Sequence, residues 1–264
     1  MTDLNTLSAS KIQAGLGTRF IGRTVVYRAE VGSTNDEARR IARAGAPEGT
    51  LVITDYQNQG RGRLDRDWVA PPGSGLLMSL VFRPELAARQ VQRLTMLCGL
   101  AVAETIEFQT GLEVGLKWPN DVVIAGSKVC GILSEIEFEG PKVSFAVVGI
   151  GVNVNLDPAL LPADLCLTAT SLSREMGAEV ARLPLLQALL KKIEKRYCTI
   201  GLAHSLHHEW AGRLVTLGKA VTVSGTTPAL QGMAEGVDVD GALLVRLADG
   251  TLEKVLAGDV SLHR

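Results

Sequence analysis

Three arginines stand within the glycine-containing stretch GRGRLDRDW at positions 60–68. A guanidinium group offers forked N–H donors that suit carboxylates and phosphates. The two glycines let the backbone approach a ligand or fold over it. The alternative is a solvated turn whose arginines pair with Asp65 and Asp67. The sequence contains no GxxxxGK[ST] pattern, so a P-loop does not account for any phosphate binding.

A second group of candidates is the Ser-Thr-Asn stretch at 33–35, between an expected strand and an expected helix. Helix N-termini carry unpaired N–H groups that favour anions, and these side chains can hydrogen-bond a polar head group. The alternative is local capping, because Thr34 followed by Glu37 fits a capping box.

A lysine ends an apolar stretch in KWPND, residues 117–121. Burying Lys117 is costly unless its amine meets an anion. The alternative is that the amine extends into solvent along its apolar stem.

The stretch VVGIGVNVN, 147–155, alternates with the period of a β-strand. One face carries valine and isoleucine and belongs in the core. The other face carries two glycines and then two asparagines, so a ligand could press on its backbone and meet amides. Close packing against a helix is the alternative. The residues of this second face are Gly149, Gly151, Asn153 and Asn155.

Strands and helices must position these stretches. The periodicity of the hydrophobic residues along the chain predicts an α+β fold. The expected sheet is mixed or antiparallel, with a hairpin turning at Gly140-Pro141. Short strands and Asp-Gly pairs after Trp210 indicate a small β-barrel. We expect domains at 1–213 and 214–264. The expected strands are 24–31, 50–57, 75–84, 113–121 up to its Pro-Asn-Asp turn, 128–140 and 141–155, and the expected helices begin at 34 and span 86–108 and 184–200.

Composition narrows the classes of function. The chain has 264 residues, 46% hydrophobic content and a net charge of −1, so no overall positive field attracts nucleic acid or anionic membrane. Four separated cysteines and the lack of an export signal suggest the cytoplasm. His204, His207 and His208 have helical metal-ligand spacing, but a solvated helix face is favoured and no metal site is predicted.

The ordered set STN, YQNQGRGRLDRDW, KWPND, SKVCGILSE and GIGVNVN resembles the catalytic core of the biotin protein ligases. The resemblance spans nearly the whole chain, including ATSL at 169–172 and the small C-terminal domain, which in this family is an SH3-like barrel. It implies an ATP-dependent, AMP-forming ligase that makes biotinyl-5'-AMP and passes biotin to a lysine of a biotin carboxyl carrier protein. Mg²⁺ is expected with ATP.

The resemblance also implies residue roles. Lys117, Arg63 and Arg66 are the expected catalytic residues. The expected biotin contacts are Ser33, Thr34, Asn35, Gln57, Arg61, Gly62, Arg63 and Lys117, and the expected ATP or adenylate contacts are Arg63, Arg66, Trp68, Asn120, Asp121, Lys128 and Asn153.

The sequence departs from the family's commonest loop pattern at Leu64-Asp65, where a basic residue and then glycine are expected. Few residues precede the first strand, so we expect the monofunctional form without a DNA-binding domain, and no repressor role. A lipoate–protein ligase and a non-catalytic biotin sensor remain the alternative functions. We expect no nucleic-acid or membrane partner; a homodimer stays open.

Overall fold

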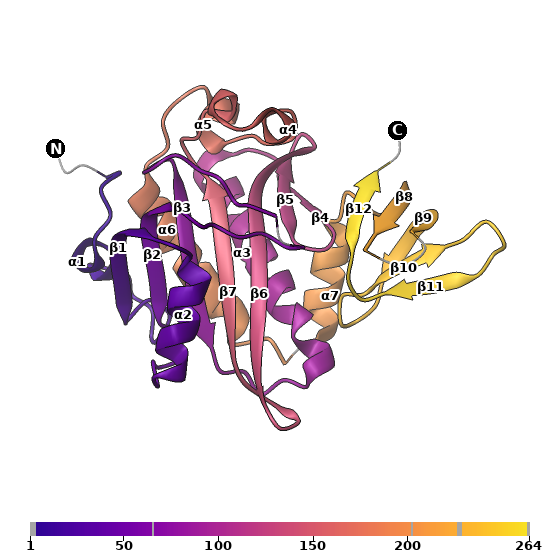
Figure 1. Cartoon of the computed structure of the whole chain (residues 1–264), viewed down its shortest axis with the longest axis horizontal. Coiled ribbons are helices and arrows are strands. Elements are labelled where there is room, and N and C mark those ends of the chain that lie inside the picture. The colour runs from indigo at the N-terminus through magenta and orange to yellow at the C-terminus, as the bar shows by residue number, and fades with distance from the viewer. Residues whose placement is uncertain (1–3, 65, 202, 226–228, 263–264) are drawn as a thin grey trace.

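The computed structural model describes residues 4–64, 66–201, 203–225 and 229–262, arranged around two β-sheets (Figure 1). The strands are β1 (Val25–Val31), β2 (Leu51–Gln57), β3 (Gly75–Phe82), β4 (Gly115–Lys117), β5 (Asp121–Ile124), β6 (Ser127–Glu139), β7 (Lys142–Asn153), β8 (Ala220–Ser224), β9 (Leu230–Val237), β10 (Leu243–Arg246), β11 (Leu252–Val255) and β12 (Asp259–Leu262). The helices are α1 (Ala9–Gln13), α2 (Thr34–Arg43), η1 (Ala88–Gln90), α3 (Gln92–Thr110), η2 (Pro158–Leu160), α4 (Ala163–Cys166), α5 (Leu172–Met176), α6 (Arg182–Tyr197) and α7 (Ala203–Gly212).

The large sheet has seven strands in the order β1-β2-β3-β7-β6-β5-β4. The pair β1–β2 is parallel and the other pairs are antiparallel, so the predicted mixed sheet is confirmed. The long hairpin of β6 and β7 turns at Gly140 and Pro141, as expected. It brings Gly131 opposite Gly151, and β3 flanks β7 so that Ser79 lies opposite Gly149.

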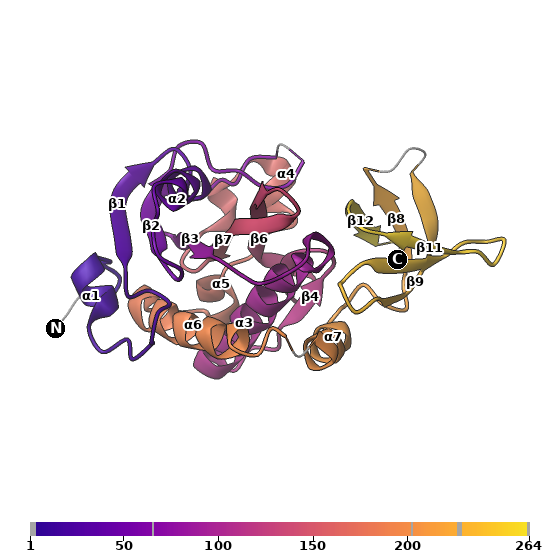
Figure 2. The ribbon, with the colours of Figure 1, turned by 90° about the horizontal axis from the view of Figure 1, so that it is seen from below.

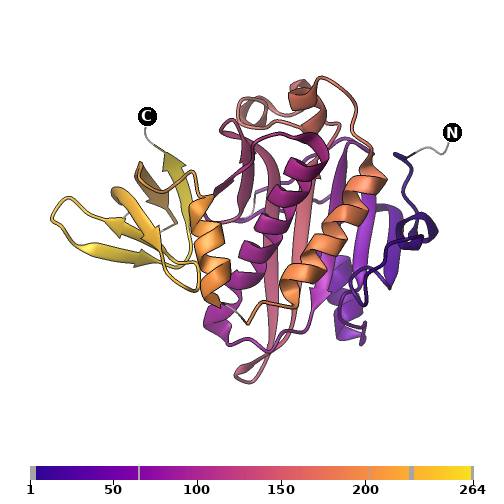
Figure 3. The same ribbon diagram turned by 180° about the vertical axis from the view of Figure 1, so that it is seen from behind.

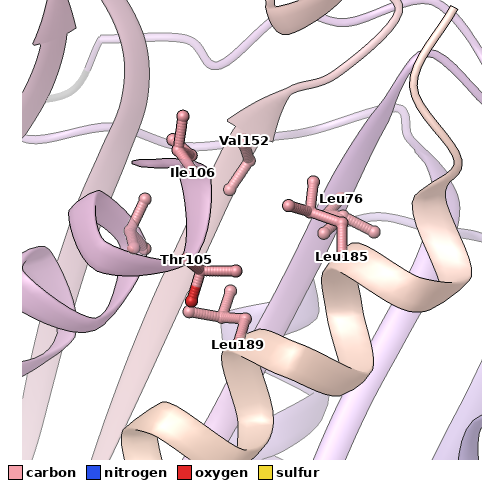
Figure 4. A pocket seen from close by; sticks show the side chains of 7 residues that line it. Leu76, Thr105, Ile106, Val152, Leu185 and Leu189 are labelled. Carbon is pink, nitrogen blue, oxygen red and sulfur yellow. The ribbon is translucent and has the colours of Figure 1, made fainter. Parts of the chain in front are cut away.

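Helices cover both faces of this sheet (Figures 2 and 3). α3 and α6 pack together over one face and bury the main core, whereas α2 lies on the other face over a smaller cluster around Val52, Val81 and Val147. A void of about 10 Å³ lies between α3, α6 and the sheet. Figure 4 shows the side chains that line it, among them Leu76, Leu185 and Thr105. The volume of this void is close to the least that holds one water, so it is a packing defect rather than a ligand site.

The second sheet is antiparallel, with strand order β11-β10-β9-β8-β12. It confirms the expected small β domain that follows the α+β layer. It lies beside β4 and α7 (Figure 1). Gly241 and Gly250 of the two Asp-Gly pairs adopt positive φ angles of 91° and 87°, which fits their prediction as turns.

Some local elements differ from the expectation. The stretch 113–121 was expected as one strand that ends in a Pro-Asn-Asp turn. The strand β4 is shorter, and Asp121 is already the first residue of β5, which was not expected. Four residues are too few for a strand period to appear in the sequence. No helix within the described ranges combines the length and apolar character that a membrane span requires.

Candidate functional site

The floor of the candidate site is the glycine face of β6 and β7. A Cβ atom on Gly151 would lie 2.6 Å from Cε2 of Trp68, and one on Gly131 would lie 2.8 Å from Cζ3 of the same ring. The bare face expected from the strand period is therefore present, and the Trp68 indole lies on it. Its Nε1 is buried without a hydrogen-bond partner, so this donor is free to meet an acceptor brought by a ligand.

Beyond the indole, the same face carries a polar cluster. Asn35 fills the space over Gly149, where a Cβ would lie 2.3 Å from Oδ1 of Asn35. The backbone N–H of Thr34 donates to Oε1 of Gln57 at 2.7 Å, and the Thr34 hydroxyl lies 3.0 Å from that oxygen. Ser33, Thr34 and Asn35 are all buried. Strand β2 and helix α2 thus bring together four of the expected biotin-binding residues.

The predicted capping box is wrong. The helix begins at Thr34, and its N-cap is Ser33, which makes no side-chain cap bond. Glu37 pairs instead with Arg40, with two contacts of 2.8 Å. The Thr34 hydroxyl faces Gln57 and Ser79 because the sheet supplies polar partners there.

The arginine loop crosses the edge of this cluster. It is a narrow turn: Gly62 N–H donates to Arg66 O at 2.6 Å, and Arg61 bridges to Asp67 through the backbone. The Arg61 guanidinium reaches Asp36 at 2.6 Å and Glu135 at 3.4 Å. Among the described residues its ion-pair partners are therefore Asp36 and Glu135, and not Asp67, one of the two aspartates that the solvated-turn alternative assumed. Asp65 lies outside the described residues.

The other two arginines of the loop meet the C-terminal domain. Arg66 lies 2.5 Å from Asp259, and Arg63 donates to Gly258 O at 3.1 Å and lies 3.5 Å from Asp259. Arg63 also donates to Asn120 Oδ1 at 3.3 Å. Burial lowers the pKa of Arg63 from its ordinary value, although Asp259 and Asp121 act in the opposite direction. Asp259 thus pairs with the guanidinium groups of Arg63 and Arg66, which could bind a phosphate instead.

The KWPND motif, residues 117–121, forms a further side of the candidate site. Lys117 ends β4 half-buried, and among the described residues its amine has no hydrogen-bond or ion-pair partner. The next side chain, Trp118, is buried and donates through Nε1 to Gly241 O at 2.9 Å. Asn120 donates to Ile132 O at 2.7 Å, which ties the motif to β6.

Lys128 lies between this motif and the indole. Its Nζ is 2.6 Å from Oδ1 of Asp121, an ion pair whose alignment is poor for a hydrogen bond. The same amine lies 5.5 Å from the centre of the Trp68 ring, within range of a cation–π contact. No three His, Cys, Asp or Glu side chains gather as metal ligands within the described part of the chain.

Other candidate residues make contacts that support the fold. Asn153 is buried and donates to Thr170 O at 3.0 Å, and Asn155 holds Val180 with two backbone contacts of 2.9 Å. His207 contacts Val237 O at 2.8 Å, while the side chain of His204 lies outside the described residues. Cys130 is fully buried, as expected, and burial raises the pKa of its thiol.

The sequence reasoning missed Ser79, Glu135 and Asp259. Ser79 is the only hydroxyl in the apolar strand GLLMSLVF and is fully buried, and that contrast could have marked it. Glu135 belongs to the alternating acidic run SEIEFE, which reads as an ordinary solvated face. No local pattern marks Asp259, since its partners lie almost two hundred positions earlier.

Comparisons with known proteins indicate the family of the chain. Residues 28–153 match the Biotin/lipoate A/B protein ligase family, and residues 216–263 match the Biotin protein ligase C terminal domain. The chain is 38% identical over 261 residues to the bifunctional ligase/repressor BirA of Bacillus subtilis, covering 97% of this chain and 79% of that protein. It is 31% identical to the biotin–[acetyl-CoA-carboxylase] ligase of Mycobacterium tuberculosis, covering 98% of each.

A solved structure is also similar. The biotin protein ligase from Aquifex aeolicus in complex with biotin and ATP superimposes with a TM-score of 0.77 at 29% identity, over 92% of this chain and 99% of that one.

Proposed function

The chain belongs to the biotin protein ligases, and from that premise we propose that it activates biotin with ATP and transfers it to a lysine of a biotin carboxyl carrier protein. The first product is biotinyl-5'-AMP, with pyrophosphate released. The observation that carries the proposal is the half-buried Lys117 amine, which has no partner among the described residues and ends a strand beside Asn120 and Asp121.

The first step joins two anions. A biotin carboxylate oxygen attacks the α-phosphorus, and the bond to the bridging oxygen breaks as pyrophosphate leaves with the electron pair. At about 4 Å and an effective dielectric of about 20, the repulsion between the reacting anions is about 4 kcal/mol. A lysine between them offsets this and stabilises the charge that grows on the phosphoryl oxygens. Lys117 has this role in our proposal, and the ionised carboxylate needs no base.

Biotin would lie on the polar cluster. Thr34, Gln57 and Asn35 offer hydrogen bonds to a polar ring, supported by Ser33. Arg61 and Gly62 would close this side from the loop, with Arg63 and Lys117 near the carboxylate. The support is the proximity of α2, β2 and the loop, as joined by Arg61 and Asp36.

The nucleotide would lie between the loop and KWPND. Arg63 and Arg66 would exchange Asp259 for the adenylate phosphate, and Trp68 would contact the adenine. Asn120, Asp121 and Lys128 line this side. Asn153 was expected here as well, and its amide already supports Thr170, so we propose that it shapes the wall rather than binding ATP directly.

Mg²⁺ fits this site mainly through the substrate. Asp121 is paired with Lys128 and Asp259 with the loop arginines, so few carboxylate oxygens remain for direct ligation. Mg²⁺ commonly keeps several waters and binds substrate phosphates through one or two carboxylates, which agrees with an indirect role for Asp121. When bound, it would neutralise the charge of the leaving pyrophosphate.

In the second step the acceptor lysine attacks the acyl carbon of biotinyl-AMP. The carbon–oxygen bond to phosphate breaks, AMP leaves with the electron pair, and the amine loses a proton to solvent. A mixed anhydride hydrolyses when water reaches it, so closure of 60–68 over it would protect the intermediate.

The remaining expectations are also proposals. We place the domain boundary at 213/214, where the chain runs beside Leu116 before the second sheet begins. Four free cysteines agree with a reducing cytoplasm. The absence of a repressor role and of a nucleic-acid partner stay predictions, which operator-DNA binding measures. The homodimer stays open, and sedimentation with and without ligands measures it.

The experiment is a product assay by mass spectrometry. The protein is incubated with Mg-ATP and equal amounts of biotin, lipoate and octanoate, without carrier. Biotinyl-adenylate as the sole adenylate supports the proposal. Lipoyl- or octanoyl-adenylate would favour the lipoate-ligase alternative, and biotin binding without any adenylate would favour the sensor.

A further inference from the structure

A buried ion pair joins the first turn of α3 to a turn of the small β domain. Arg93 donates through Nε and Nη2 to Oδ1 of Asp240, at 3.1 and 2.7 Å. The two side chains are only 8% and 17% exposed. Desolvation of two buried charges offsets much of their attraction, so such a pair adds little net stability. Its main effect is on geometry, because two N–H groups aimed at one oxygen set the position of the turn on the helix.

The turn is also held by contacts of its own. Asp238 Oδ1 accepts the backbone N–H groups of Asp240 and Ala242, both at 2.9 Å. Between these two residues, Gly241 adopts a φ angle of 91° and lies so close to α3 that a Cβ atom would be 2.9 Å from the sulfur of Met96. The carbonyl of Gly241 is therefore fixed against the helix.

That carbonyl is the acceptor for the Trp118 ring. Nε1 of Trp118 donates to Gly241 O at 2.9 Å, and the residue is 2% exposed, so loss of this acceptor would leave a buried donor unsatisfied. The first turn of α3 holds the next residue directly, since Gln92 Nε2 donates to Pro119 O at 3.1 Å. Both residues that follow Lys117 are thus placed by the start of α3, one directly and one through the β domain.

We propose that Arg93 and Asp240 are positioning residues for the Lys117 amine. Their ion pair fixes the turn 238–241, and the turn fixes the Trp118 ring next to Lys117. A displaced ring moves the backbone that carries the amine, and a shift of about 1 Å at a reacting group can cost about a hundredfold in rate. This role rests on the proposed function, because it explains how the same site places its cation between the two anions.

The test measures two quantities on the full chain: the single-turnover rate of adenylation with biotin and Mg-ATP, and the Kd for biotin by titration calorimetry. Asp240→Asn removes the charge and keeps the size of the side chain. The rate should fall by about tenfold or more, while the Kd stays within about threefold because the proposed biotin contacts of α2 and β2 are unchanged. Asp240→Glu keeps the charge and should recover most of the lost rate.

Trp118→Phe tests the same route from the other end. It removes the N–H that Gly241 accepts and leaves the ion pair in place, so it should also slow adenylation by about tenfold. Because the ion pair acts through this ring in our proposal, the effects of Asp240→Asn and Trp118→Phe should not add. The double variant should be about as slow as the slower single variant, whereas independent defects would multiply.

Glu104→Gln is the matched control. Glu104 lies on the same helix and pairs with Arg196 of α6, and the two side chains are 25% and 14% exposed, close to the values of the proposed pair. This variant also turns a carboxylate of an ion pair into an amide, at a place without contact to KWPND among the described interactions. It should lower the melting temperature and leave the adenylation rate within about twofold of wild type.

Four results would each overturn the inference and leave the ligase proposal standing. They are an Asp240→Asn rate within about twofold of wild type, an Asp240→Glu rate no higher than that of Asp240→Asn, losses that multiply in the double variant, and a rate loss in Glu104→Gln equal to that in Asp240→Asn. Wild-type protein that forms no biotinyl-adenylate overturns both proposals.

Discussion

At the scale of single residues, Lys117 is held by its neighbours, since its amine has no partner in the part of the chain that the structure describes. Leu116 and Trp118 on either side are buried, and the Trp118 ring is fixed by its bond to Gly241. The amine is therefore presented from a rigid backbone. A cation placed in this way costs little reorganisation when two anions arrive.

Replacing Lys117 by Ala should leave folding normal and reduce adenylate formation by several orders of magnitude, because the shared cation is lost. The measurement is pyrophosphate release with biotin and Mg-ATP, alongside a thermal melt. Lys142→Ala, at the exposed start of β7, is the control. Adenylation within a few-fold of wild type would remove Lys117 from the mechanism.

Gly151→Ala tests the bare floor. The added methyl group would lie 2.6 Å from the Trp68 ring, well inside contact distance, so the ring must move. We expect the KM for ATP to rise by about tenfold and biotinyl-adenylate to leak into solvent as free biotin and AMP. Gly236→Ala, with its nearest neighbour at 3.9 Å, is the matched strand glycine. Unchanged ATP kinetics would show that the floor does not position Trp68.

At the scale of elements, α6 anchors the segment before β1 through one carboxylate. Glu194 accepts N–H bonds from Arg19, Phe20 and Ile21 at 2.9–3.1 Å. Burial raises the pKa of Glu194, but the three backbone bonds outweigh it, so the pKa lies below the ordinary value. The ionised carboxylate therefore stabilises the folded chain.

The sign of the pH dependence follows. A depressed pKa in the folded state contributes stability above the unfolded pKa, and this contribution disappears as the pH falls through the folded value. Glu194→Gln should lower the melting temperature at pH 7, and the difference from wild type should narrow below about pH 4.5. Calorimetric melts at both pH values measure it, with exposed Glu253→Gln as control. A difference that does not change with pH would contradict this account.

The strands of the site also show which features could be predicted from the sequence. The glycine face of 147–155 was predictable because a strand repeats every two residues, and the hairpin at Gly140 was marked by turn residues. The occupants of that face, Trp68 and Asn35, were not predictable, because strand periodicity says which side chains point together and not which distant segment covers them.

At the scale of the whole molecule, the small β domain reaches the site at two points. The turn at 238–241 receives the Trp118 ring, and Asp240 pairs with Arg93 at 2.7 Å. The start of β12 holds Arg63 and Arg66 of the loop. The domain is thus placed to support both KWPND and the loop. Pairings over such sequence distances could not be predicted from local pattern.

Thr216→Val tests that support. The fully buried Thr216 hydroxyl accepts the backbone N–H of Trp118 at 3.0 Å, and valine leaves that N–H unsatisfied. We expect a loss of about 1–3 kcal/mol in stability. The rate of adenylation should fall by about tenfold or more, because Lys117 precedes the displaced residue.

Thr105→Val is the control for Thr216→Val. The buried Thr105 hydroxyl donates only to the backbone carbonyl of Ala101, within the same helix. Stability loss without any loss of rate in Thr216→Val would limit the β domain to a structural role. The readouts are denaturant unfolding and single-turnover kinetics.

The position of Trp68 over Gly131 and Gly151 also gives the protein an optical property. The chain has three tryptophans, and the other two, Trp118 and Trp210, are 2% exposed within the core. Trp68 alone lies on a loop, half-buried, with the Lys128 amine 5.5 Å from its ring. Changes in ultraviolet emission on adding biotin and ATP should therefore come from Trp68 and vanish in Trp68→Phe. Loop closure could then be followed in real time without any attached dye.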